Sequence, residues 1–79
     1  MITVLVHIIN EDPVVGEMET IPTTDTVNLI IHNPRLRDGK SVSYLDRDVS
    51  TVVWPMHRIN FIEIYSDEEE EEIISHVRE

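Results

Sequence analysis

The chain has 79 residues, no cysteine and a formal net charge of −10 at neutral pH. A chain of this length can bury only one hydrophobic core, so we expect a single domain. The lack of cysteine excludes disulfide bridges, thiolate zinc sites and thiol nucleophiles, and the acidic balance argues against general binding of polyanions.

Alternating apolar residues predict a first strand over residues 2–9. One face of this segment carries Ile2, Val4, Val6 and Ile8. Leu5 makes the opposite face partly apolar as well, so the strand should be covered on both sides. After a turn, residues 14–21 predict a second strand. Gly16 lies inside it, and a glycine within a strand marks a bend, a bulge or a close approach of two backbones.

The next part of the chain also predicts extended structure. The further extended segments are residues 27–32, 42–45, 51–56 and 59–65. Asn33-Pro34 should end the third strand, because the residue before a proline avoids helical backbone and both residues favour turns. Pro55 has no amide donor, so the strand around it should lie at an edge, at a bulge or at a strand end.

Only residues 66–79 show helical periodicity. Ser66 is a good N-cap and Glu69 follows three residues later, which predicts a capping box at the start of an acidic helix. This segment holds seven acidic residues and one arginine, a net charge of −6, whereas residues 1–65 carry only −4. The glutamate run could bind calcium or a basic partner, but a solvated helix start that matches the helix dipole is the favoured interpretation.

The sequence offers no catalytic constellation, so we expect no enzyme and no cofactor. It has neither a nucleophile-elbow serine nor a glycine-rich phosphate loop. Its four histidines lack the short spacing of a metal site, and we predict no metal, although a site built from His32 and His57 across strands stays open.

Three of the five basic residues in the body of the chain lie close together, at Arg35, Arg37 and Lys40. With Tyr44 or Trp54 nearby they could hold a phosphate and stack a base. A solvated loop whose bases pair with local aspartates is the favoured alternative. Trp54 is more often a core or interface residue than a stacking platform.

The order of these elements resembles the Sm and Sm-like family of small, strongly bent β-barrels. In that family a glycine in strand two is followed by an Asp, a hydrophobic residue and an Asn that opens strand three. Residues 16–29 match this motif with Gly16, Asp25 and Asn28, although the interval is longer and Pro22 stands where the Asp is commonly found. The second family motif, a base with Gly before an Asn, is represented by Arg58 and Asn60 without the Gly.

The resemblance implies a mainly β, five-stranded Sm-like (SH3-type) barrel over residues 1–65, with residues 66–79 as an acidic C-terminal helix of the same domain. The chain is most similar to Sm-like proteins of marine cyanophages. Family members form rings in which strand four of one subunit pairs with strand five of the next, and single-stranded RNA binds around the pore. We therefore expect a homo-oligomeric ring of about five to seven subunits.

The resulting expectation is a non-enzymatic, ring-forming protein that binds single-stranded RNA or DNA and takes part in nucleic-acid processing. The residues that would line the inner loops are Asp25, Asn28, His57, Arg58 and Asn60. Arg58 would supply charge, Asn28 hydrogen bonds or loop order, and His57 a stacking surface. The alternative is a homo-oligomeric protein-interaction module that presents the acidic helix and binds no nucleic acid. We expect neither a signal peptide nor a membrane span, and a cytoplasmic location, in the host if the protein is phage-encoded.

Overall fold

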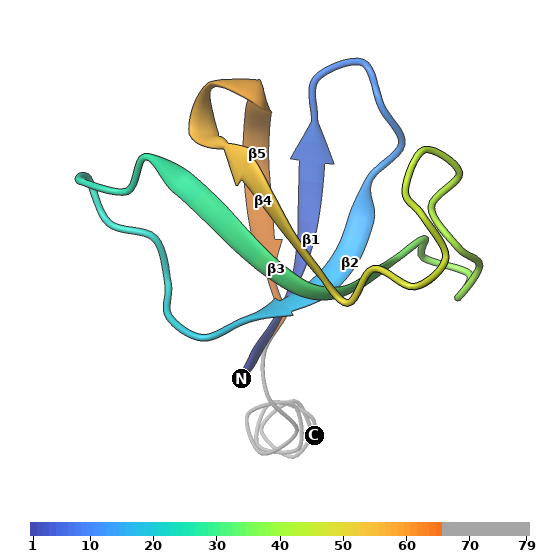
Figure 1. Cartoon of the computed structure of the whole chain (residues 1–79). Helices are drawn as coiled ribbons and strands as arrows, with labels where there is room; N and C mark the ends of the chain where they lie inside the picture. The colour runs from blue at the N-terminus through green and yellow to red at the C-terminus, as the bar shows by residue number, and fades with distance from the viewer. Residues whose placement is uncertain (66–79) are drawn as a thin grey trace, which may run out of the picture.

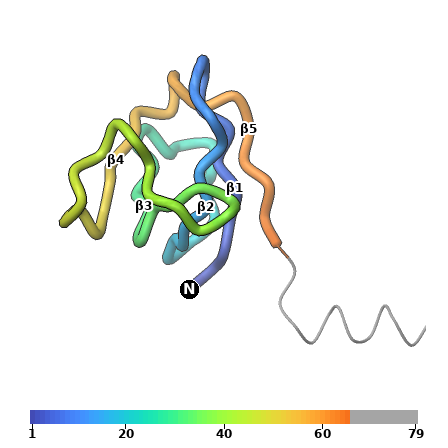
Figure 2. Tube along the Cα trace, turned by 90° about the vertical axis from the view of Figure 1, so that its right-hand side faces the viewer, coloured from blue at the N-terminus to red at the C-terminus, as the bar shows by residue number. Residues whose placement is uncertain are grey.

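A computed structural model describes residues 1–65 as one antiparallel sheet of five strands in the order β4-β3-β2-β1-β5. The strands are β1 Ile2–Ile8, β2 Val14–Met18, β3 Asn28–Arg35, β4 Thr51–Pro55 and β5 Ile59–Ile64. A short 3₁₀ turn, η1 (Met56–Arg58), joins β4 to β5. The sheet curls strongly into a half-barrel (Figures 1 and 2). The prediction of a mainly β fold with five strands is confirmed, and the predicted acidic helix lies outside the described residues.

The core lies on the concave face of the curled sheet and draws on every strand except β5 for its most buried side chains. These are Val4, Val6, Ile8, Val14, Met18, Leu29, Ile31 and Trp54, with Val42 from the loop before β4. Leu5 points to the opposite face of β1 and is also buried, which confirms that this strand is covered on both sides. Each such aliphatic side chain contributes about 1.5–3 kcal/mol to folding.

Gly16 lies at a close approach of β2 to β3. A Cβ atom at this position would overlap Cγ2 of Ile31 and lie 2.9 Å from the carbonyl oxygen of His32. No residue with a side chain fits there without displacement of β3. The sequence-based prediction of a bend or close backbone approach at Gly16 is confirmed, and this contact allows β3 to cross β2 as the sheet curls.

β3 is longer than predicted because it contains a bulge. Val15 and Glu17 are two positions apart on β2, whereas their partners Arg35 and His32 are three positions apart on β3. Asn33 has a left-handed φ of 54°, and its N–H donates to Ser50 O at 2.7 Å. Asn33-Pro34 therefore does not end the strand. Asparagine tolerates left-handed backbone, and a bulge accepts a proline because one of its residues stays outside the ladder.

A second bulge lies in β5. Ile8 pairs with Ile59 and His7 pairs with Phe61, so Asn60 is an extra residue on β5. The bulge brings Ile59 and Ile62, three residues apart, to the same concave face, where both pack against the core. It also leaves Asn60 exposed at the end of the sheet that carries η1.

One predicted strand segment was wrong, and another was predicted too long. Residues 42–45 form a turn, closed by Leu45 N–H to Val42 O at 3.1 Å, and their apolar side chains fix this loop to the core. The second strand ends at Met18 instead of Ile21, and Ile21 is exposed in the loop that follows. In both places the apolar residues belong to a loop, where they either pack on the core or are exposed. A loop forms no regular strand pairing, so its apolar residues need not alternate between two faces.

The two edges of the sheet are β4 and β5. Within residues 1–65 neither strand has a second neighbouring strand, and Figure 2 shows them at opposite sides of the fold. Pro55 lies in β4, so the prediction that it belongs to an edge or a strand end is confirmed. In the part of the chain that the structure describes, no helix is long and apolar enough to cross a membrane.

Candidate functional site at the β2–β3 loop and the β4–β5 turn

The end of the β2–β3 loop and the η1 turn are adjacent. Met56 N–H donates to Val27 O at 2.9 Å, and Asn28 pairs with Pro55 at the start of the β3–β4 ladder. Ile9 N–H donates to Arg58 O at 2.8 Å, which fixes the other side of η1 to β1. In Figure 1 the β4–β5 turn and the start of β3 lie toward the same end of the sheet. Two segments nearly thirty positions apart in sequence thus share one surface.

The predicted site residues occupy this surface in different ways. Asn28 is the exposed first residue of β3, His57 and Arg58 are exposed on η1, and Asn60 is the exposed bulge residue of β5. Asp25 is farther along the loop, in a turn closed by Thr26 N–H to Thr23 O at 3.1 Å. The structure brings four of the five predicted site residues to one end of the sheet, namely Asn28, His57, Arg58 and Asn60. Asp25 lies apart from them in the middle of the β2–β3 loop.

The chemistry available on this surface is polar and partly cationic. Arg58 forms no ion pair with a carboxylate of residues 1–65. Its guanidinium can donate to a phosphate, because Arg presents several N–H groups in a planar fork. Asn28 and Asn60 offer amide groups that both donate and accept, and the exposed ring of His57 offers a surface for stacking.

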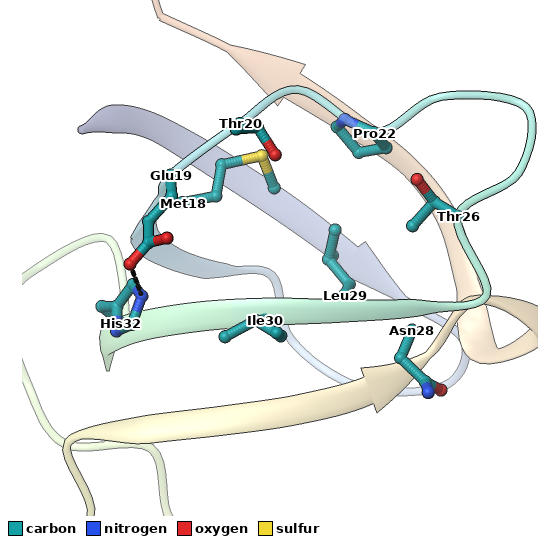
Figure 3. Close-up of a pocket in the computed structure, with 9 residues that line it drawn as sticks. All are labelled: Met18, Glu19, Thr20, Pro22, Thr26, Asn28, Leu29, Ile30 and His32. Atoms are coloured by element: carbon teal, nitrogen blue, oxygen red, sulfur yellow. Dashed lines mark ion pairs between the residues drawn. The ribbon is translucent and has the colours of Figure 1, made fainter.

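A cavity of about 470 Å³ lies under the β2–β3 loop, beside this surface. Its lining residues are Met18, Glu19, Thr20, Pro22, Thr26, Asn28, Leu29, Ile30 and His32. Figure 3 shows Met18 and Leu29 pointing into it from the strands, with Thr20, Pro22 and Thr26 on the loop above. The cavity exists because β2 and β3 diverge beyond the Glu17–His32 pair.

One end of the cavity holds a polar group that the sequence did not suggest. His32 Nε2 lies 3.6 Å from a carboxylate oxygen of Glu19, and its Nδ1 lies 3.1 Å from Thr51 Oγ1. Predicting this contact requires the β2–β3 register, which depends on the bulge at Asn33. His57 follows β4 at its far end, so the structure does not bring His32 and His57 together. No group of three metal-binding side chains occurs within residues 1–65.

The alternative basic site on the β3–β4 loop is weakened by two contacts. Arg35 forms a two-pronged ion pair with Glu17, at 3.2 Å and 2.9 Å, and also donates to Asn33 O at 2.8 Å. The hydrogen bonds from Arg35 hold the pKa of Glu17 below its ordinary value of 4.5. Trp54 is buried in the core and cannot stack on a base. Burial raises the pKa of Tyr44, and the negative charges of Glu11 and Asp12 raise it further.

Exposed apolar side chains line the two edge strands. Val53 on β4 is 57% exposed and pairs across the ladder with Ile30, which is 51% exposed. On β5, Phe61 is 54% and Ile64 is 46% exposed. Phe61 stacks on His7 at 4.0 Å between ring centroids, and His7 in turn contacts Glu63 at 2.8 Å. An edge strand with such side chains is suited to pair with another chain.

Comparison with protein-family models, with curated proteins and with solved structures finds no significant match to this chain.

Proposed function

We propose that this chain is a non-enzymatic, Sm-like subunit that assembles into a closed homo-oligomeric ring and binds single-stranded RNA or DNA. The observation that supports the proposal is a pair of edge strands that have only one neighbouring strand each within residues 1–65. β4 and β5 lie at opposite ends of the strand order, and both carry exposed apolar side chains. Pairing β4 of one copy with β5 of the next satisfies both edges, and because the contact is head-to-tail it closes into a ring when the rotation permits.

The candidate nucleic-acid surface supports the second half of the proposal. The resemblance of the chain to Sm-like proteins assigns strand binding to the loop after the second strand and the turn before the fifth. In this fold those two segments are joined by the Met56–Val27 hydrogen bond. In a ring, each copy would present Asn28, His57, Arg58 and Asn60 once, so the strand would meet a repeated set of donors and stacking surfaces.

The acidic charge of the protein limits how such binding can work. Residues 1–65 carry a net charge of −4 and the whole chain −10, and a ring multiplies both. Long-range repulsion therefore opposes the approach of a polyanion, and affinity must come from close contacts at Arg58 and from stacking. We expect binding to be measurable at low salt and to weaken steeply as salt rises, because phosphate contacts release counterions.

A fluorescence-anisotropy titration with U-rich, A-rich and DNA oligonucleotides tests this function. Arg58→Gln should weaken binding by about tenfold or more, because a charge-assisted hydrogen bond contributes about 1.5 kcal/mol or more. Arg47→Gln is the matched control, since it makes the same charge change in the exposed β3–β4 loop and should leave affinity within about twofold.

A protein that assembles yet binds none of these strands at low salt would refute the nucleic-acid half of the proposal. That result would favour the alternative function, a homo-oligomeric protein-interaction module. Deletion of residues 66–79 then separates the two: loss of a protein partner supports the alternative, whereas unchanged or tighter oligonucleotide binding supports the first function.

A further inference from the structure

The backbone hydrogen bonds show which groups of β4 point to the free edge. Met56 N–H bonds to Val27 O and Asn33 N–H bonds to Ser50 O, so both ends of the β3–β4 ladder share one register. Because bonding alternates along an antiparallel strand, residues 50, 52, 54 and 56 face β3. Within residues 1–65, Thr51 and Val53 therefore each have an N–H and a C=O that point away from β3 without a backbone partner, while Pro55 has only its C=O.

The same reasoning applies to β5. Tyr65 N–H bonds to Thr3 O at 3.0 Å, in register with the pairs Leu5–Glu63 and His7–Phe61. Residues 61, 63 and 65 therefore face β1, and the N–H and C=O groups of Ile62 and Ile64 point to the free edge. The bulge at Asn60 interrupts this regular pattern. Each edge thus has two residues, two positions apart, whose N–H and C=O groups both point outward; we call these complete bonding residues. At one end of each edge lies a residue that breaks this pattern, Pro55 on β4 and Asn60 on β5.

We propose that two copies of the chain pair antiparallel with Thr51 opposite Ile64 and Val53 opposite Ile62, and that Pro55 and the Asn60 bulge fix this register. The inference rests on the proposed ring assembly and specifies its contact. In this register Pro55 meets Asn60, so the residue without a donor lies opposite the residue outside the regular ladder. All four complete bonding residues then exchange their hydrogen bonds.

The two neighbouring registers form fewer backbone hydrogen bonds between the copies. A shift of two residues one way places Pro55 opposite Ile62, whose C=O then has no donor. A shift the other way places Val53 opposite the bulge at Asn60, and only Thr51 keeps a complete partner. The proposed register also covers exposed apolar surface, because it brings Val53, which is 57% exposed, beside Ile64, which is 46% exposed.

Cysteine cross-linking tests the register directly, because the natural chain contains no cysteine. The double variant T51C/I64C carries both thiols at exposed positions. Cα atoms of a directly opposite bonded pair lie about 5.5 Å apart, within the range of a disulfide, whereas those of residues two positions out of register lie about 7–8 Å apart. T51C/I64C should therefore form intermolecular disulfides at least about fivefold faster than the shifted pairs V53C/I64C and T51C/I62C.

Two further measurements keep the outcomes distinct. Light scattering on the reduced variants reports whether they assemble at all, and V53C/I62C tests the same register if T51C/I64C fails to fold by circular dichroism. Pro55→Ala restores a donor at the edge, so in that background V53C/I64C should cross-link several-fold faster than in the parent. An assembled protein in which a shifted pair reacts fastest overturns the register alone, whereas a monomer overturns the assembly and the register together.

Discussion

Replacement of Gly16 by alanine tests the close approach that allows the sheet to curl. The new Cβ would overlap Cγ2 of Ile31 and lie 2.9 Å from the His32 carbonyl oxygen. Ile31 is fully buried and its backbone is held against Val52 in the β3–β4 ladder, so neither atom can retreat freely. Overpacking of this kind costs about 1–3 kcal/mol. The upper half of this range applies because neither atom can retreat. The smaller entropy of an alanine-containing unfolded chain returns about 0.4–1 kcal/mol, so the net loss is about 1–2.5 kcal/mol.

Urea unfolding at fixed protein concentration measures this loss, and thermal unfolding should show a lower Tm by about 5–15 °C. In an Ile31→Ala background the overlapping Cγ2 is absent, so Gly16→Ala should cost about 1 kcal/mol less than in the parent. Gly39→Ala is the matched control: a Cβ there meets nothing within 4 Å, and its cost comes from the φ of 90° alone. Gly39→Ala should show no coupling to Ile31→Ala. A neutral or stabilising Gly16→Ala would show that β3 moves away freely from a side chain at this position.

Two other predictions concern side chains around the β3 bulge. Arg35 holds the pKa of Glu17 below 4.5, so the ion pair stabilises the fold above that pH and loses its effect as pH falls through the lowered value. The difference in unfolding free energy between the parent and Glu17→Gln, measured by urea unfolding, should therefore shrink from about pH 6 to about pH 3. An equal difference at both pH values would contradict this. Asn33→Gly should leave the free energy of unfolding nearly unchanged, whereas Asn33→Ala should lower it by about 1 kcal/mol, because a φ of 54° strains alanine. Equal stability of the two variants in thermal unfolding would count against a left-handed Asn33.

The sequence predicted the features that depend on local chemistry. Alternation along β1 indicated that both of its faces are covered, Gly16 indicated a bend, a bulge or a close backbone approach in β2, and Pro55 indicated an edge, a bulge or a strand end. Each of these follows from a property of one residue or one short segment. The features that sequence missed depend on the pairing of distant segments. The bulges at Asn33 and Asn60 change the register by one residue, and nothing in the local sequence distinguishes them from a strand end or a regular strand.

The candidate site shows the same division. Motif positions predicted that Asn28 and Arg58 belong together, and the hydrogen bond between Val27 and Met56 gives that proximity a structural basis. The contact between Glu19 and His32, and the cavity beside it, arise only after the bulge in β3 has set which residues of β2 and β3 face one another. Neither the Glu19–His32 contact nor the cavity can be predicted while the register between β2 and β3 is unknown.

Native mass spectrometry of the full chain tests most directly whether β4 and β5 of neighbouring copies pair to close a ring. We expect one discrete stoichiometry that persists across a tenfold range of micromolar protein concentration, and its loss in Val53→Asp, which places a charge on the apolar edge. A chain that stays monomeric over this range, or an assembly that Val53→Asp leaves intact, would contradict it.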